Sequence, residues 1–432
     1  MVYRRSLVFP LPSEGFPPAL RLLLNDYRLL VNQLLRFLLV HEKTARRSIT
    51  PYARQLARAY RVNWYHASTA IRVAQSLAKG HRRRQRKRTS AKVPHVLRPF
   101  LRADHRTFHF APETGKVRLS LRNGEWTGFT VPVPAHHRAQ LAVPGTRVQQ
   151  LVVTPDRISL VYAREAPGPY RPERLLSFDT NESSLDGVRV APTGAQLCRV
   201  AFPEVRAVQA RHFARRRRLA RKKAHDRRVA RRLLHREGAR ERHRVQQRLH
   251  LVSKRLVEFA ATERAAIALE QLVFSPPRRR ARCPHSSLRR STSGGRALRR
   301  RLSVWPRREL HRQILYKAEA RGVPVFLVNP RHTSTTCPRC GVRSDRRNRA
   351  GTMFGCAACG WRFDRQLNAG LNIARTVLEE VPELGGLWLD LDALPQDVRS
   401  PLYAAATAST HGRSGREGSG IHSESDLGHS LE

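Results

Sequence analysis

Acidic residues are scarce in this sequence. The 432 residues include 33 Asp and Glu against 82 Lys and Arg, which gives a formal net charge of +49. A compact fold with that excess of one sign repels itself unless a polyanion neutralises it. The shortage of acids therefore predicts a polyanionic partner, and the length predicts two or three domains rather than one core.

Long apolar runs are also lacking, which argues against a membrane as that polyanion. The most apolar early segment, Leu29 to Val40, is interrupted by polar residues, and no uninterrupted apolar stretch reaches the length of about 18 residues that a membrane-spanning helix needs. The apolar run within Met1 to Phe9 is cut short by Pro10, so we expect no secretory signal. The sequence predicts nucleic acid as the partner, no membrane, and a cytoplasmic, nucleoid-associated location.

Cysteine is the third scarce residue, but four of the six cysteines form two close pairs. The pairs are Cys337-Pro-Arg-Cys340-Gly and, after fifteen intervening residues, Cys356-Ala-Ala-Cys359-Gly. Six cysteines are too few for a disulfide scaffold in a chain of this length, and paired spacing is typical of metal sites in a reducing compartment. Cys198 and Cys283 have no partner motif, and we interpret them as ordinary thiols.

Each cysteine pair can form a zinc knuckle. Two residues between the thiolates let the chain turn so that both sulfurs face one ion, and the glycine after the second cysteine permits a left-handed turn. Two disulfides or a redox pair are the alternatives, but the compartment disfavours the first and the second needs only one pair. Four thiolates complete a tetrahedral site and leave no position for water or substrate. The pattern predicts a structural Zn²⁺ ion bound by Cys337, Cys340, Cys356 and Cys359.

The first part of the chain changes from helical to strand-like patterns. We expect a strand over residues 2–10, helices over 17–80 and a mobile basic arm at Lys79 to Lys92, which is too polar to fold alone. Short β-like runs follow at Lys116 to Arg122, Phe129 to Val133, Val148 to Val153 and Arg157 to Tyr162. They predict a small β-barrel or sandwich.

The second part begins with a strand candidate, Leu175 to Phe178, and continues into a basic helical region over Pro203 to about Glu263. One apolar seam within that region is formed by Val245, Leu249, Val252 and Leu256. A turn near Gly238 would divide the region into two antiparallel helices. Further along we expect a mobile loop over residues 275–300, a helix over Ser303 to Arg321, a strand over Val323 to Val328 and a disordered tail beyond about residue 400.

Three of the scarce acids stand at the ends of apolar runs. Asp179 ends Leu-Leu-Ser-Phe-Asp, Glu270 ends Ala-Ala-Ile-Ala-Leu-Glu, and Asp364 follows Trp-Arg-Phe just after the second cysteine pair. A charge beside a core is costly unless it is paired or binds a metal ion, although a single Asp in such a place is often a helix N-cap. Two-metal phosphodiester hydrolysis requires several carboxylates that converge from different elements. The set therefore predicts metal-ion nuclease chemistry.

Four segments together resemble a known family. They are SFDTNESSLDGV (177–188), IALEQL (267–272), RRLSVWPRRELHRQILYKAEARGVPVFLVNPRHTSTTCPRCG (300–341) and CGWRFDRQLNAGLNIA (359–374). In order and spacing they resemble the OrfB/TnpB family of transposon-encoded nucleases, which are relatives of the type V CRISPR effectors. The resemblance covers roughly residues 171–385. The first half of the chain is similar only in its general pattern, a β-barrel interrupted by a helical insert.

The resemblance implies an α/β fold. It consists of an RNase H-like (RuvC-type) nuclease domain with an inserted four-cysteine zinc ribbon, preceded by a β-barrel that carries a helical insert. The implied ranges are 1–15 for the first barrel strand, 16–94 for the helical recognition insert with its basic arm, 95–170 for the barrel, 171–328 for the nuclease domain with its basic helical insert, 329–361 for the ribbon, 362–385 for the last nuclease motif and helix, and 386–432 for the tail.

The resemblance also implies an activity. Family members bind a guide RNA derived from the transposon end and cut double-stranded target DNA that pairs with it beside a short adjacent motif. Asp179, Glu270 and Asp364 would then be catalytic and would bind Mg²⁺, with two ions in all. Arginine-rich regions would hold the guide–target heteroduplex by its backbone. The expected function is an RNA-guided, metal-dependent DNA endonuclease that takes part in transposition.

Two departures from the family pattern keep other functions open. Many members have Asp-Arg-Asp before the Asn-Ala step, with the second acid taken as the metal ligand, whereas this chain has Asp364-Arg365-Gln366. The chain also has Asp179-Thr-Asn181 where Asp-x-Gly is commoner, and a subgroup resembles it in both respects. The departures indicate a variant active site. They leave open a nuclease-inactive RNA-guided DNA-binding repressor, and a non-enzymatic zinc-ribbon RNA-binding protein is the third alternative.

Overall fold

The structure of the protein is a computed structural model that describes residues 2–11, 17–41, 45–86, 91–122, 124–222, 224–271, 305–343 and 353–394. The chain divides into two compact units, Met1–Ala166 and Pro167–Glu432. The loop expected over 275–300, Cys283 and the tail expected beyond residue 400 all lie outside the described residues. No helix in the described part of the chain has the length and apolar character needed to cross a membrane.

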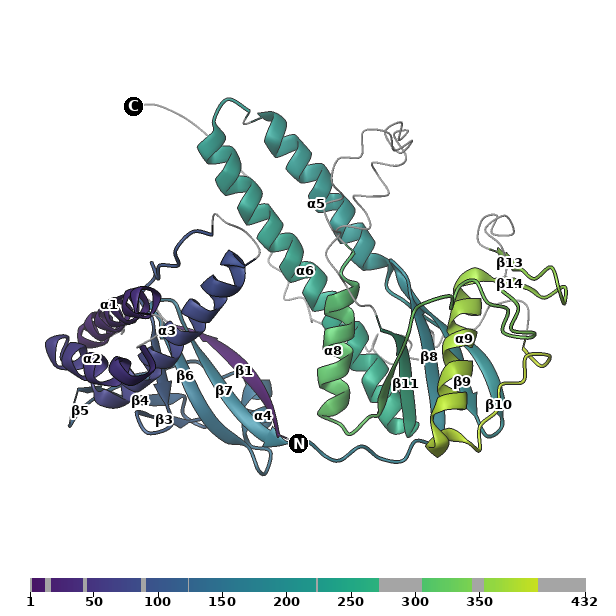
Figure 1. Cartoon of the computed structure of the whole chain (residues 1–432), viewed down its shortest axis with the longest axis horizontal. Coiled ribbons are helices and arrows are strands. Elements are labelled where there is room, and N and C mark those ends of the chain that lie inside the picture. The colour runs from purple at the N-terminus through teal and green to yellow at the C-terminus, as the bar shows by residue number, and fades with distance from the viewer. Residues whose placement is uncertain are drawn as a thin grey trace, which may run out of the picture. The chain divides into compact units, whose positions relative to one another are not determined.

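The first unit contains two antiparallel sheets (Figure 1). One sheet, with the order β1-β7-β6-β2, is formed by β1 (Val2–Pro10), β7 (Arg157–Glu165), β6 (Arg147–Thr154) and β2 (Leu101–Asp104). The other, with the order β3-β4-β5, is formed by β3 (Phe108–Ala111), β4 (Lys116–Arg122) and β5 (Glu125–Thr130). A short helix, α4 (Ala135–Leu141), connects β5 to β6. The first strand of the chain is therefore held by the last strand of the unit, β7.

The β-barrel predicted for this unit is not confirmed. Strands β3, β4 and β5 pair only with one another in the part of the chain that the structure describes, so neither sheet closes. Strand β4 pairs with β3 on one side, for example Leu119 with Phe108, and with β5 on the other. Its backbone N–H and C=O groups are therefore used within this sheet. Three of the four predicted β-like runs lie within β4, β6 and β7, whereas the run predicted over Phe129 to Val133 overlaps only the end of β5.

Three helices lie between β1 and β2 in the chain: α1 (Pro18–Val40), α2 (Ala45–Ala59) and α3 (Trp64–Gln85). Helices α1 and α3 pack through side chains at helical spacing, including a buried contact in which Tyr27 Oη lies 2.9 Å from Thr69 Oγ1. The helices predicted over 17–80 are confirmed.

The mobile arm predicted at Lys79 to Lys92 is wrong over its first half, because α3 continues to Gln85. Ala78 and His81 are buried on one face of this helix, and Arg82 Nη2 donates to the backbone carbonyl of Leu38 at 2.8 Å. Tertiary packing thus keeps the basic segment helical although its composition alone would not.

The second unit is built on one mixed sheet with the order β10-β9-β8-β11-β12. Its strands are β8 (Arg174–Thr180), β9 (Ser184–Ala191), β10 (Gly194–Ala201), β11 (Ala265–Glu270) and β12 (Val325–Val328). Strands β8, β9 and β10 form an antiparallel meander, whereas β11 runs parallel to both β8 and β12. Parallel neighbours need crossover connections, and α5, α6 and α8 supply them.

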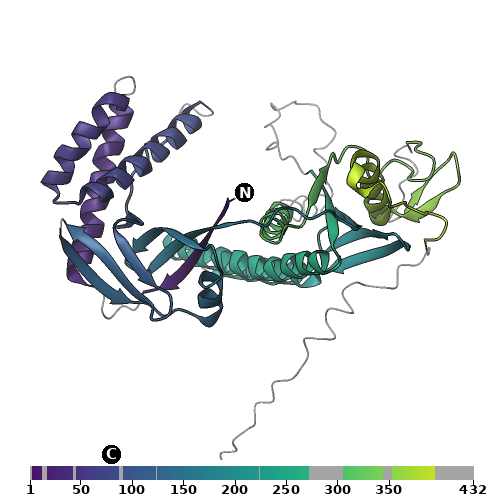
Figure 2. The same cartoon turned by 90° about the horizontal axis from the view of Figure 1, so that it is seen from below.

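Helices cover both faces of this sheet (Figure 2). On one face Leu176 and Phe178 pack with α5 (Pro203–Lys222), α6 (Arg227–Thr262) and α8 (Arg307–Glu319). On the other face Leu175 and Ala268 pack with α9 (Arg365–Glu380). Because side chains alternate along a strand, Asp179 near the end of β8 and Glu270 at the end of β11 belong to the face that α9 covers.

The basic helical region forms two helices that lie side by side and run in opposite directions, as Figure 1 shows. The turn predicted near Gly238 is wrong, because Gly238 lies inside α6. The helix begins instead at Asp226, whose Oδ1 atom accepts from two backbone amides of the first turn at 3.0 and 3.1 Å. The predicted apolar seam is confirmed, since Val245, Leu249, Val252 and Leu256 are buried.

Helix α9 approaches the sheet closely at two glycines. A Cβ atom on Gly370 of α9 would stand 2.5 Å from Gly187 Cα of β9, and a Cβ atom on Gly187 would stand 1.8 Å from the carbonyl oxygen of Ser177. Ser177 Oγ also donates to the carbonyl of Gly370 at 2.7 Å. The two glycines therefore set the distance between α9 and the strands that end in carboxylates.

Candidate functional site

The four paired cysteines come together at one point. Their sulfur atoms all lie within 4.8 Å of one another. Cys337 Sγ is 3.6 Å from Cys359 Sγ, and Cys340 Sγ is 3.5 Å from Cys356 Sγ. A tetrahedron with Zn–S bonds of about 2.3 Å separates its sulfurs by about 3.8 Å, so the cluster could hold a zinc ion. Among the described residues it is the only group of three or more His, Cys, Asp and Glu side chains spaced to bind a metal ion.

The backbone around the cysteines has the two turns that the sequence predicts. Gly341 and Gly360, which follow the second cysteine of each pair, have φ values of 74° and 73°. Their amides donate to the carbonyls of Cys337 and Cys356 at 3.0 and 3.1 Å. The second pair lies between β13 (Met353–Gly355) and β14 (Arg362–Asp364), which are hydrogen-bonded to each other. The predicted left-handed turns are thus confirmed.

Two of the three predicted catalytic acids lie at the carboxyl ends of neighbouring parallel strands. Asp179 belongs to β8 and Glu270 ends β11, whose preceding residue pairs with Phe178. Burial and, next, the negative charge of Glu270 raise the pKa of Asp179 to about 7. Burial also raises the pKa of Glu270. Both acids resist ionisation in the absence of a cation, and a bound cation would stabilise their charged forms.

A chain of hydrogen bonds orients Glu270. Thr333 Oγ1 donates to Glu270 Oε1 at 2.8 Å. Asn372 Nδ2 of α9 donates to the carbonyls of Thr333 and Thr336, both at 2.8 Å. Asn368 Nδ2, one turn earlier in α9, donates to the same Thr336 carbonyl at 3.0 Å. Helix α9 therefore fixes the segment before the first cysteine pair, and through it the carboxyl group of Glu270.

Asn181 joins Asp179 to a further buried acid. Its Nδ2 atom donates to Asp179 Oδ2 at 3.1 Å and to Asp186 Oδ2 at 2.9 Å. Asp186 is completely buried, accepts a hydrogen bond from Ser184 Oγ and forms an ion pair with Arg199. Because both of its carboxyl oxygens are engaged in these contacts, Asp186 serves as an anchor for Asn181.

The start of α8 borders the same strand ends. Trp305 Nε1 donates to the backbone carbonyl of Asn181 at 3.1 Å. His311 Nε2 lies 2.8 Å from Thr180 Oγ1. Burial and, next, the positive charge of Arg307 lower the pKa of His311 to about 4. The imidazole beside β8 is therefore neutral at physiological pH.

The third predicted acid, Asp364, has a different local role. Its Oδ1 atom accepts from the backbone amides of Gln366 at 2.9 Å and Leu367 at 3.1 Å, so it N-caps α9. No metal-binding group that the described residues form includes Asp364. The structure thus brings Asp179 and Glu270 together and places Asp364 at the start of the helix that covers their face of the sheet.

Several residues of this site are missed by sequence reasoning. They are Asp186, Thr333, Asn368 and Asn372, whereas Asn181 stands out in the sequence only as a departure from the family pattern. One signal is visible in the segment Leu-Asn-Ala-Gly-Leu-Asn, where two amides recur four residues apart among apolar residues of a helix. Buried amides require hydrogen-bond partners, so this spacing predicts a fixed polar segment opposite the helix. Asp186 gives no comparable signal, because its burial depends on the pairing of β8 with β9.

Comparison with known proteins agrees with this geometry. Residues 308–373 match the Cas12f1-like, TNB domain. A TnpB-like protein of Methanocaldococcus jannaschii is 24% identical over 207 residues, which cover 46% of this chain and 68% of that protein. The fold is similar to that of Cas12f1 in the solved Cas12f1–sgRNA–target DNA complex, with a TM-score of 0.54, 15% identity and 82% of each chain covered.

The three likenesses concern different features of the chain. The domain match spans α8, the cysteine cluster and the first half of α9. The archaeal relative extends the sequence similarity over almost half the chain, and the likeness to Cas12f1 supports the RuvC-containing α/β fold broadly. Together these likenesses support a protein of the OrfB/TnpB family.

Proposed function

We propose that this protein is an RNA-guided DNA endonuclease of a transposable element. It would cut guide-matched double-stranded DNA by metal-dependent hydrolysis. The observation that carries the proposal is the adjacency of Asp179 and Glu270 on two neighbouring parallel strands, where burial raises the pKa of both acids even though the positive charge of Arg307 opposes the shift at Glu270. Structural acids in a chain this rich in arginine would be paired with arginine, as Asp186 is with Arg199.

The two acids fit a divalent cation. Carboxylate oxygens are the ligands that Mg²⁺ prefers, and burial makes a shared ion the simplest way to charge both groups. Two Mg²⁺ ions, when bound, would activate a water molecule and stabilise the leaving oxygen of the phosphodiester. The chain's own contribution is orientation, since Asn181 holds Asp179 and Thr333 holds Glu270.

We assign the third carboxylate to Asp364. Its Oδ1 atom caps α9, while its Oδ2 atom accepts no hydrogen bond from the described residues and stays available to an ion. Gln366 is a poorer ligand because its side chain is neutral. The assignment gives one acid to each of β8, β11 and the N-terminus of α9.

We further propose that the four cysteines bind a structural zinc ion. In this arrangement the ribbon, residues 329–361, is inserted between nuclease segments 171–328 and 362–385. The inserted ribbon contains Thr333, which donates a hydrogen bond to Glu270, and Asp364 follows its last residue by three positions. Zinc would then stabilise the segments on both sides of the nuclease site.

A nuclease-inactive RNA-guided DNA-binding protein is the second candidate. One observation favours it: Gln366 stands where many family members have an acid, and Asp364 already has a structural role as a helix cap. In this alternative the site would hold DNA without cutting it, and the protein would act as a repressor.

One experiment separates these candidates. The full chain is expressed with its native flanking DNA, the bound RNA is sequenced, and matched and mismatched DNA are incubated with the purified complex and Mg²⁺. We expect RNA from the element's end and cleavage of matched DNA alone, with both RNA and DNA binding retained in Asp179→Ala but cleavage lost. Matched DNA that is bound but uncut with either Mg²⁺ or Mn²⁺ would establish the repressor, and purification without RNA would refute both candidates.

A further inference from the structure

The first unit contains a basic cavity that the proposed nuclease chemistry does not use. Its volume is about 540 Å³, and it lies between the end of α2, the start of α3 and the β4–β5 hairpin. Four arginines line it, Arg54, Arg58, Arg61 and Arg122, against one acid, Glu125. The cavity therefore has a strong positive charge within a single folded unit.

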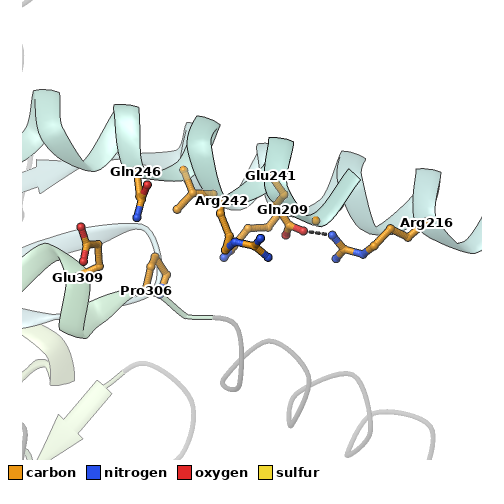
Figure 3. Close-up of a pocket in the computed structure, with 9 residues that line it drawn as sticks. Gln209, Arg216, Glu241, Arg242, Gln246, Pro306 and Glu309 are labelled. Carbon is orange, nitrogen blue, oxygen red and sulfur yellow. Dashed lines mark hydrogen bonds and ion pairs between the residues drawn. The ribbon is translucent and has the colours of Figure 1, made fainter. Parts of the chain in front are cut away.

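A cavity in the second unit differs from this one in its balance of charges (Figure 3). That cavity, about 500 Å³ between α5, α6 and α8, is lined by two arginines, Arg216 and Arg242, and by two acids, Glu241 and Glu309, so its formal charges balance. Arg216 forms an ion pair with Glu241, and Glu309 forms one with Arg312. In the first unit, by comparison, Arg54, Arg58 and Arg61 form no ion pair with any described residue, although all three are exposed.

One of the three arginines, Arg54, has an aromatic contact that restricts its side chain before any ligand arrives. The guanidinium carbon of Arg54 lies 5.2 Å from the ring centroid of Trp64, a cation–π contact that restricts the side chain. Arg58 follows one helical turn later on the same face of α2, so it lies beside Arg54. The buried side chains of Ala57 and Val62 line the same cavity and limit how far the arginines can fold inward.

The backbone conformation of Arg61 is a further observation that points to a ligand in this cavity. Arg61 has a φ of 51°, in the left-handed region that favours glycine. It ends α2, with its amide donating to the carbonyl of Arg58 at 3.1 Å and the Val62 amide donating to Ala57 at 2.8 Å. Helices commonly end with glycine at such a position. A long cation in a strained backbone conformation that glycine would relieve indicates that its guanidinium group is used.

We propose that this cavity binds a phosphodiester group of a nucleic-acid strand, with Arg54, Arg58 and Arg61 as the hydrogen-bond donors. Guanidinium groups donate to two phosphate oxygens at once, and unpaired exposed guanidinium groups bind them without first breaking an ion pair. The inference rests on the proposed function only for its partner, nucleic acid, and it names a contact that lies outside the nuclease unit.

The test compares two double variants of the full chain that lose the same charge. Arg58→Ala/Arg61→Ala removes two cavity donors, and Arg138→Ala/Arg147→Ala removes two exposed arginines of the same unit that do not line the cavity. Fluorescence anisotropy with a short labelled RNA, and with a labelled DNA duplex of the same sequence, is measured in EDTA from about 50 to 200 mM salt. We expect the cavity variant to bind about tenfold more weakly, with a salt slope reduced by about two, and the control variant to stay within about twofold of wild type.

The two nucleic acids distinguish the source of the phosphate. Weakening with RNA alone assigns the phosphate to the guide, and weakening with DNA alone assigns it to the target. Cavity and control variants that bind both nucleic acids equally well would overturn the proposal. Because the assay measures binding without Mg²⁺, its result does not depend on cleavage. A protein that never cuts DNA can still show phosphate binding at this cavity, and a protein that cuts DNA can lack it.

Arg61→Gly provides an independent check should the double variant fail to fold. Glycine relieves the left-handed backbone, so a residue with only a structural role would give a higher melting temperature and unchanged binding. The proposal predicts a higher melting temperature together with weaker binding. Unchanged binding in Arg61→Gly would count against it as firmly as an inert double variant.

Discussion

The Oδ1 atom of Asp364 accepts a hydrogen bond from the backbone amide of Gln366 at 2.9 Å. The acid that we assign to the metal site therefore also begins the helix that covers that site. A cap and a metal ligand make different demands on one side chain, because an amide can cap a helix but binds Mg²⁺ poorly. This difference allows the two roles of Asp364 to be separated.

The first prediction concerns Asp364. Asp364→Asn should keep the cap and the melting temperature but abolish Mg²⁺-dependent cleavage, whereas Asp364→Ala should lose cleavage and also about 0.5–2 kcal/mol of stability. Gln366→Ala should still cut. Cleavage of matched DNA and thermal unfolding are measured on all three variants. If Asp364→Asn cuts at the wild-type rate, Asp364 is only a helix cap.

The second prediction concerns zinc. Cys337→Ser or Cys359→Ser should lower the zinc content and destabilise the second unit, because binding of zinc to a structural site is worth about 10–16 kcal/mol in peptides. Cys198→Ser, which changes a buried cysteine outside the cluster, is the matched control and should keep its zinc. Metal analysis and thermal unfolding check both statements. Full zinc occupancy in either cluster variant would contradict the prediction.

The third prediction concerns Thr333, which donates to Glu270. Thr333→Val keeps the shape of the side chain but removes the donor, and residues that orient metal ligands typically contribute about 10–100-fold to metal affinity. We expect the Mg²⁺ concentration for half-maximal cleavage to rise by about tenfold or more. Thr335→Val is the control, since among the described residues Thr335 Oγ1 donates only to the carbonyl of His332. Equal Mg²⁺ requirements in the two variants would exclude a positioning role for Thr333.

The fourth prediction concerns pH. His311 has a pKa of about 4 in the folded protein and an ordinary value of 6.5 when unfolded, so between these values the unfolded state binds more protons. Stability from this group is complete above pH 6.5 and is lost as the pH falls toward 4, by about 3 kcal/mol in total at about 1.4 kcal/mol per tenfold change in proton affinity. His311→Gln should remove this part of the acid sensitivity, whereas the exposed control His235→Gln should not. Urea unfolding at several pH values measures the difference, and identical pH dependence in wild type and His311→Gln would refute it.

The fifth prediction uses two glycines in helix interiors. Gly370→Ala should destabilise the second unit by about 1–3 kcal/mol, because the new methyl group would overlap the backbone of β9. Gly238→Ala should stabilise α6 by up to about 1 kcal/mol, since the nearest atom to its new methyl group is the end of the Arg242 side chain at 3.6 Å. Denaturant unfolding of both variants tests for opposite signs. A stable Gly370→Ala variant would mean that α9 is free to move away from the sheet.

The features that could be predicted from the sequence are those determined by neighbouring residues. The cysteine knuckles depend on a spacing of two residues and a following glycine, and the seam of α6 depends on helical periodicity, so both are confirmed. The position of Asp179 and Glu270 at strand ends follows from the apolar runs before them.

The features that were missed depend on contacts between distant segments. The arm after residue 79 is helical because α3 packs on α1, and the two sheets of the first unit do not close because β3, β4 and β5 pair among themselves. The predicted turn at Gly238 failed because one glycine costs a long, packed helix only about 1 kcal/mol. The true helix start was readable from the N-cap residue Asp226, which precedes a segment rich in Arg, Ala and Leu, all good helix formers.

The close seat of α9 on the sheet has a consequence for how the protein is made. A ribosome completes β11 before α9, and the 94 residues between Glu270 and Arg365 take roughly 5–20 s to synthesise. During that interval the sheet face that Leu175, Val188 and Ala268 share with α9 is without that helix, and such transiently exposed apolar surface is prone to aggregation. The same delay keeps Asp364 from its partners, so a growing chain with the proposed site cannot cut DNA until the segment that contains Asp364 and α9 has been synthesised.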